Sequence, residues 1–161
     1  MAAGLGVNMY ADLWSFALST YARPGIEAAC LRLQEQGADV CLMLCGAWLE
    51  QRGVAVTPER MSALKQIAGP WQVQVVEPLR RMRMQWRATA QQDKPLAALR
   101  ERVKALELDA ERVLLTRLEE LAQTWPAGEG HQKWLEGLAA EAAANLDHDA
   151  LQQLRIVATG T

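Results

Sequence analysis

The sequence predicts an all-α protein, a single compact multi-helix bundle of about seven to eight helices. Strand-forming residues are scarce, with two Tyr, one Phe and few Ile and Thr in 161 residues. The commonest residues include Ala, Leu, Glu, Gln and Arg, which cost least in a helix. Because 50% of the residues are hydrophobic and 22% are charged, we expect an ordinary globular core. The length indicates one domain over residues 1–161.

Capping residues and glycines mark the first three helices. Asp12 is a good N-cap for a helix that reaches about Tyr21. Pro24 suits the first turn of a second helix, which ends near Gly37. A third helix covers about residues 39–52. Its apolar residues occur on every side rather than in one stripe, and such a pattern is typical of a fully buried helix. We therefore place this helix at the centre of the bundle.

Prolines dominate the next stretch. Thr57, Pro58 and an acid in the first turn start a fourth helix, expected to stop near Gly69. Pro70 begins a fifth helix, which runs to about Thr89. Pro78 lies inside it, where a proline removes one backbone hydrogen bond and clashes with the preceding turn. The sequence leaves open whether Pro78 kinks this helix or breaks it.

One long helix is predicted over about residues 96–124, with Asp93 near its start. Its apolar residues alternate at spacings of three and four, like a coiled-coil seam, before the register slips by one. The seam residues are Leu96, Leu99, Val103, Leu106, Ala110 and Val113. Two shorter helices follow, over about 131–144 and 148–158. Within the single domain we therefore distinguish a core over 1–92, the long helix over 93–125 and a C-terminal helical hairpin over 126–161.

The common catalytic and cofactor motifs are missing from the sequence. It has no phosphate-binding loop with Lys, no Gly-x-Ser-x-Gly elbow and no His-Glu-x-x-His pair, so we expect no metal site and no cofactor. Cys30, Cys41 and Cys45 lie in apolar helical segments, and we interpret them as buried free thiols of the core. The first nine residues lack the Lys and Arg of a signal peptide, and the apolar run 40–49 is too short to span a bilayer. We expect a cytoplasmic protein with no membrane contact.

Basic charge is concentrated in one segment. The chain has a net charge of -2, yet residues 78–87 contain four arginines and no acid. On a helix, Val75, Leu79, Met82 and Trp86 would form a buried stripe. Arginines at 80, 83 and 87 would line one flank of that stripe, where guanidinium groups can bind phosphates or carboxylates. The candidate partner- or anion-binding residues are Arg80, Arg83, Trp86 and Arg87.

Three uses of these arginines stay open. They can pair with acids of the long helix in the same chain, bind a protein partner, or bind a nucleotide or nucleic acid. Glu107 and Glu111 of the long helix are one turn apart. We expect them to form a solvated face beside Lys104 and Arg112 rather than a cation site.

A series of short motifs resembles a known family. The motifs are Leu13-Trp14-Ser15-Phe16, Tyr21-Ala22-Arg23-Pro24-Gly25, Cys30-Leu31-Arg32-Leu33-Gln34, Gly37-Ala38-Asp39-Val40, Trp48-Leu49, Trp71 and Val76-Glu77-Pro78-Leu79-Arg80. In this order they are similar to a family of short proteobacterial proteins of unknown function, over about residues 9–90. The resemblance implies a compact helical cytosolic protein and favours the first ninety residues as the functional unit.

The sequence names no reaction. Our leading hypothesis is a non-enzymatic helical interaction or adaptor protein, which binds a protein partner or itself through the basic helix face. The first alternative is a helical-bundle enzyme or a binder of a phosphorylated small molecule. The second alternative is weak RNA binding, which the acidic C-terminal third disfavours.

Overall fold

The computed structural model describes residues 12–130, 132–139 and 148–160, and within these ranges the regular structure is entirely helical. This confirms the predicted all-α class. The helices are α2 (Leu13–Tyr21), α3 (Ile26–Glu35), α4 (Val40–Gln51), α5 (Pro58–Trp71), the π-helical η1 (Gln72–Val76), α6 (Glu77–Gln85), α7 (Arg87–Ala90), α8 (Lys94–Ala122), α9 (Trp134–Leu138) and α10 (His148–Thr159). None of them is both long and apolar enough to cross a bilayer.

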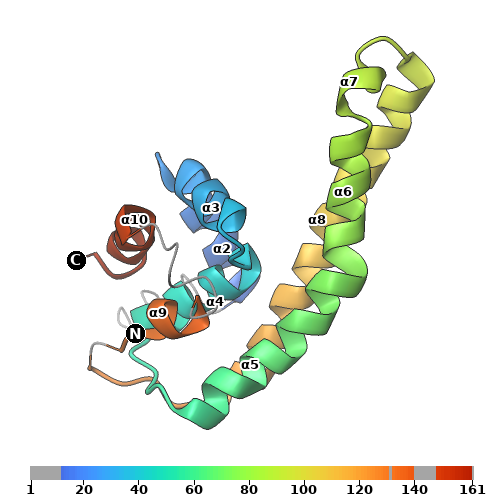
Figure 1. Ribbon diagram of the computed structural model, residues 1–161. Coiled ribbons are helices and arrows are strands. Elements are labelled where there is room, and N and C mark those ends of the chain that lie inside the picture. Colours follow the sequence, from blue (N-terminus) through green and yellow to red (C-terminus); the bar gives the residue numbers. More distant parts are fainter. Residues whose placement is uncertain (1–11, 131, 140–147, 161) are drawn as a thin grey trace.

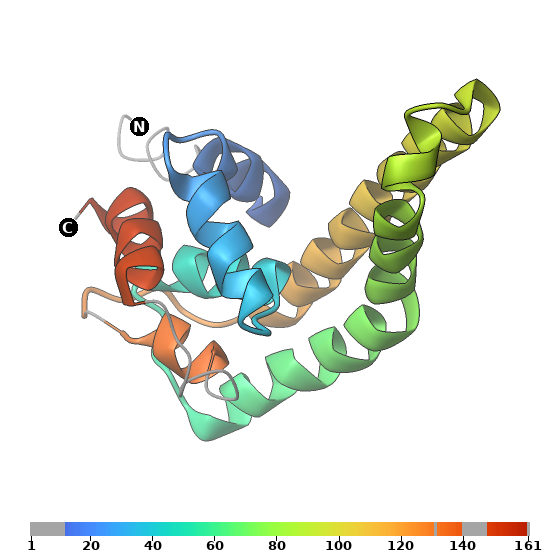
Figure 2. The same cartoon turned by 45° about the horizontal axis from the view of Figure 1, so that its top comes forward.

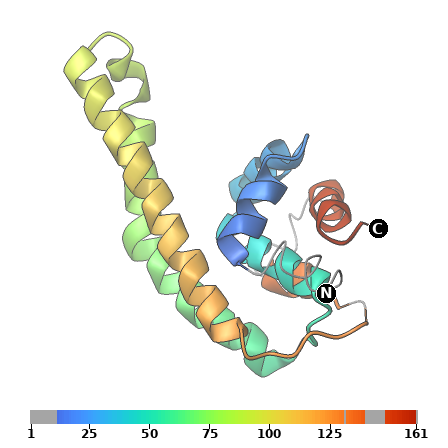
Figure 3. The same ribbon diagram turned by 180° about the vertical axis from the view of Figure 1, so that it is seen from behind.

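The helices form a globular lobe and a long helical arm (Figure 1). The lobe consists of α2, α3, α4, α9 and α10. The arm is a hairpin in which α5, η1, α6 and α7 run outward and α8 returns. Two further views show that the far end of the arm projects well beyond the lobe (Figures 2 and 3). The lobe contacts the arm through α5 and α8, whereas α6 and α7 pack mainly on α8.

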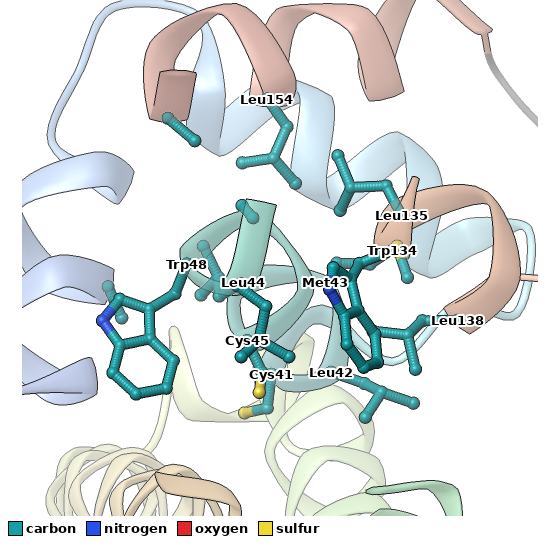
Figure 4. Close-up of a cluster of buried hydrophobic side chains, with 14 of the residues drawn as sticks. Cys41, Leu42, Met43, Leu44, Cys45, Trp48, Trp134, Leu135, Leu138 and Leu154 are labelled. Carbon is teal, nitrogen blue, oxygen red and sulfur yellow. The ribbon is translucent and has the colours of Figure 1, made fainter. Parts of the chain in front are cut away.

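Helix α4 is the centre of the lobe, as predicted. Every residue from Cys41 to Glu50 is buried. Among the described helices, those that contact it are α2, α3, α5, α8, α9 and α10. Figure 4 shows its side chains meeting those of α9 and α10 in one apolar cluster. The three cysteines are free and buried, as expected, and burial raises the pKa of the Cys30 thiol to about 12.

The predicted helix starts are present as side-chain caps. Asp12, Asp39, Thr57 and Asp93 each accept a hydrogen bond from the backbone N–H three residues later, at 3.0–3.2 Å. The second helix differs slightly from expectation. It begins at Ile26 rather than at Pro24, because Gly25 has a φ of +84° and serves as its N-cap.

The predicted stop near Gly69 is wrong, because the chain stays helical from Pro58 to Gln85. Pro70 has a helical φ, and buried Leu64 and Ala68 hold its helix against the rest of the molecule. Pro78 also leaves the helix unbroken. The π turn of η1 comes directly before it and widens the helix where the proline ring would meet the preceding turn.

The arm is only two helices thick beyond the lobe, which corrects a second expectation. The stripe Val75, Leu79, Met82 and Trp86 was predicted to be buried, but no residue of α6 is buried and Met82 is exposed. The reason is that α6 has one long neighbour, α8, and no other helix in the described part of the chain forms a third layer over it.

The C-terminal helices close the lobe through a buried ion pair. Glu50 of α4 is buried, and its carboxylate accepts hydrogen bonds from Arg155 Nε at 2.7 Å and Nη2 at 2.9 Å. It also accepts the backbone N–H of Leu135 at 2.9 Å. Arg155 further pairs with Glu136. The helix predicted over 131–144 is described as α9 only from Trp134 to Leu138, and residues 140–147 lie outside the described part.

Replacing a buried residue of α4 tests its central place. Trp48→Ala and Leu44→Ala each remove a side chain that is at most 5% exposed. We expect each change to lower the free energy of unfolding by about 2–5 kcal/mol, because it leaves a cavity in the core. Urea denaturation measures this loss. Val73→Ala, at an exposed position, is the control and should change stability by less than about 0.5 kcal/mol.

The buried ion pair gives a second stability prediction. Glu50→Gln removes the buried carboxylate from the Arg155 guanidinium and leaves it paired with the exposed Glu136. We expect a loss of about 3–5 kcal/mol, typical when one partner of a buried pair is removed. Glu35→Gln changes an exposed carboxylate of the same lobe and should be nearly neutral. Equal melting temperatures for the two variants would contradict this role of Glu50.

Candidate functional site

Charged side chains gather where the arm leaves the lobe. Arg83 of α6 donates from Nε to Glu107 Oε1 of α8 at 2.6 Å and from Nη2 to Oε2 at 3.3 Å. Arg80 donates from Nε to Glu107 Oε2 at 3.3 Å. The Glu107 side chain is only 9% exposed. Two guanidinium groups therefore neutralise one nearly buried carboxylate and tie α6 to α8.

Two further carboxylates lie beside this pair. Glu111 is one turn along α8, and its Oε2 lies 3.9 Å from Arg80 Nη2. Asp39, the cap of α4, also accepts a hydrogen bond from Gln72 Nε2 at 2.8 Å. Gln72 is the first residue of the π turn, which thus presents its amide to the lobe. The second oxygen of Asp39, Oδ2, is buried and has no hydrogen-bond partner among the described residues.

Two cavities flank these side chains. The first, of about 300 Å³, lies between α2, α4, α6 and α8 and is lined by Trp14, Tyr21, Leu44, Leu108, Glu111 and others. The second, of about 290 Å³, lies on the side of Asp39, Gln72 and Arg80. Gln34 and Val40 line both cavities and stand between them. The junction thus combines apolar walls with a few polar groups, the usual make-up of a ligand pocket.

Burial and neighbouring charges shift the pKa values of the titratable side chains at the junction. Burial raises the pKa of Glu111 to about 7, and the nearby Glu107 carboxylate adds to this effect. Burial also raises the pKa of Asp39 to about 6, against the hydrogen bonds that stabilise its charge. The Tyr21 hydroxyl keeps its proton, because burial raises its pKa to about 12. The nearby arginines therefore do not fully compensate the carboxylates of the junction.

The structure separates the four residues that the sequence singled out. Arg80 and Arg83 form the intramolecular ion pairs that were one open alternative for them. Arg87 is exposed and forms no ion pair with a described residue, and Trp86 is half-buried. Binding of a partner or an anion by the four residues stays a prediction.

Other residues of the junction were missed or misjudged. The expectation of a solvated face at Glu107 and Glu111 is wrong for Glu107, because α6 covers it with two arginines. Sequence reasoning also missed Gln72 and Tyr21. Gln72 carried no signal, since a π turn is what aims it at Asp39.

The free surface of the arm has its own character. Residues 77–107, which include Glu107 and the two arginines paired with it, have eight basic and four acidic residues, a net charge of +4 in a chain of net charge -2. Half of the predicted coiled-coil seam of α8 is left uncovered. Leu99, Leu106 and Val113, spaced seven residues apart, are 47%, 53% and 39% exposed. The remaining seam residues Leu96, Val103 and Ala110 are buried or half-buried.

Most of these features lie in a part of the chain that matches a known protein family. A family model described as "Protein of unknown function (DUF2390)" matches residues 12–118. The chain belongs to the DUF2390 family. The match reaches from the cap of α2 almost to the end of α8, so it spans more of the long helix than the resemblance in the sequence implied. It includes the ion pairs of Arg80 and Arg83, the residues that line the first cavity, and the arm up to the last four residues of α8, and it excludes α9 and α10. No curated protein and no solved structure matches the chain.

The raised pKa of Glu111 predicts how stability depends on pH. Its pKa is about 7 in the folded chain against an ordinary value of 4.5, so the folded protein binds a proton that the unfolded chain releases. The free energy of unfolding should therefore fall as the pH rises between these two values. Glu111→Gln removes this proton exchange, and the variant should lose less stability over the same interval and exceed the wild type above about pH 7.

Urea denaturation at a series of pH values measures this slope. Asp39, whose pKa is also raised, contributes in the same direction in both proteins. Glu120→Gln is the matched control, because Glu120 is exposed on the same helix, and it should keep the wild-type slope. A Glu111→Gln variant less stable than the wild type throughout would show that the ionised carboxylate stabilises the fold.

Proposed function

We propose that this DUF2390 protein is a non-enzymatic interaction protein whose arm binds an acidic, amphipathic helix of a protein partner. The observation that carries the proposal is the uncovered seam on α8, formed by Leu99, Leu106 and Val113. A spacing of seven residues keeps side chains on one line along a helix and is the pattern that a second helix packs against. A partner helix would supply the third layer that the arm lacks.

Charge supports an acidic partner. Arg102 lies on α8 between Leu99 and Leu106, within one turn of each, and it is exposed. Arg81 and Arg87 are exposed on the outgoing helices of the same arm. With a net charge of +4 over residues 77–107, the arm would attract an acidic surface and repel a basic one. Arginine and tryptophan are also enriched among residues that dominate binding, which favours Arg87 and Trp86 as contributors.

The alternatives fit the arm less well. A phosphorylated small molecule held by the arginine cluster would have to displace Glu107 from Arg80 and Arg83. RNA binding would use the basic charge but not an exposed line of Leu and Val side chains. We place the interaction in the cytoplasm, where the three free cysteines would stay reduced.

Site-specific photo-crosslinking in the host cell tests the proposal. A photoreactive phenylalanine analogue at Leu106 should form a crosslink to one defined protein, whose crosslinked segment is an acidic amphipathic helix. The same analogue at Gln153, exposed on α10, should not capture that protein. Arg87→Glu with Arg102→Glu should abolish the crosslink, because the change reverses two charges on the surface that the partner contacts.

The design avoids Arg80 and Arg83, since replacing them would leave Glu107 unpaired and weaken the arm itself. Arg23→Glu with Lys133→Glu, at two exposed positions of the lobe, matches the charge change and should leave the crosslink unchanged. Unaffected capture by the Arg87/Arg102 variant would contradict the proposed surface. Crosslinking of Leu106 to RNA, or to a second copy of the chain, would replace the acidic partner with that occupant.

A further inference from the structure

The first cavity at the junction has a mixed lining that suits a small molecule. Its apolar walls come from α2 and α4 and from Leu108 and Leu115 of α8. Polar groups also line it, from Tyr21, Gln34, Arg83, Lys104, Glu107 and Glu111. A cavity of about 150 Å³ holds one benzene molecule, so the volume of about 300 Å³ here accommodates a body of about twice that size.

The charges around the cavity leave one carboxylate without a full partner. Glu107 accepts hydrogen bonds from both Arg80 and Arg83, the shortest being the 2.6 Å bond from Arg83 Nε. Arg80 also donates to Gln34 at 2.8 Å when the amide oxygen of Gln34 is turned toward it. Glu111 has only the 3.9 Å contact with Arg80, and its carboxylate accepts no hydrogen bond from a described residue. Asp39 adds a third carboxylate to a group that holds two arginines.

Other cations near the cavity are engaged elsewhere. Lys104 lines the cavity, but its Nζ pairs with Glu101 at 3.6 Å and its side chain is 48% exposed. The guanidinium of Arg112 lies over the Trp14 ring, 5.0 Å from its centre. The Glu111 side chain is itself 25% exposed, so a molecule entering the cavity can reach its carboxylate.

We propose that this cavity binds a small molecule with an apolar body and one ammonium group, and that Glu111 is the counter-ion of the ammonium. The ammonium would give Glu111 the close partner that its 3.9 Å contact with Arg80 does not provide, and the Tyr21 hydroxyl is a further acceptor in the same cavity. A carboxylate or phosphate ligand would instead face Glu111 with arginines already engaged by Glu107. The apolar walls would enclose the body of the molecule.

Calorimetric titration with three probes of similar shape tests the ligand class. The probes are 2-phenylethylammonium, the neutral 2-phenylethanol and the anionic 3-phenylpropanoate, at about pH 8, where Glu111 is largely ionised. We expect the ammonium probe to bind at least about tenfold more tightly than either of the other two. Equal affinity of the alcohol, stronger binding of the carboxylate, or no binding of the ammonium probe at millimolar concentration would overturn the proposal.

Two variants locate the binding. Glu111→Gln keeps the shape of the side chain and should weaken the ammonium probe by at least about tenfold, while Glu120→Gln on the same helix should not change its affinity. Leu108→Trp fills the cavity from its exposed edge and should block the probe with Glu111 intact. Unchanged affinity in either Glu111→Gln or Leu108→Trp would show that the probe binds elsewhere. The exposed seam of the arm is distinct from this cavity, so the outcome does not decide the proposed partner binding.

Discussion

The fold depends on one constraint, the need to cover α4 on every side. The side chains of this helix are apolar around its whole circumference, so packing against one face alone would leave the other faces in contact with water. The molecule meets the need with segments from both ends of the chain and with the base of the arm, which together enclose it. Glu50 is buried in the same place and is satisfied by Arg155 from the last helix. The lobe and the arm base are therefore one cooperative unit.

The same constraint fixes where the arm begins. Because α5 and the second half of α8 are needed to cover α4, their inner faces are committed to the lobe, and the hairpin leaves it at the level of the π turn. Asp39 caps α4 and accepts the amide of Gln72 from this turn, so one carboxylate links the central helix to the arm. The polar junction and its cavities arise where the two helices of the arm leave the tightly packed core.

The sequence predicted the features that depend on local chemistry. The caps at Asp12, Asp39, Thr57 and Asp93 and the burial of α4 follow from side chains that act within a turn or two of their own position. It failed where the outcome depended on neighbours far along the chain. The sequence predicted a helix start at Pro70, but the packing of the residues on both sides of this proline keeps the helix continuous. The apolar stripe through Met82 was predicted to be buried, but no described helix forms a third layer over it. Glu107 was predicted to be solvated, because the sequence does not show that two arginines of α6 pair with it.

The two-helix cross-section of the arm also determines how different parts of the molecule open. Helices α6 and α7 bury no residue completely, whereas α4 is enclosed throughout. Local opening of the arm tip therefore costs a fraction of the free energy of global unfolding. Backbone amides near Gln85 will exchange with solvent deuterium through such openings, while those of α4 exchange only when the lobe unfolds. The tip and the lobe thus behave as separate units of protection within one chain.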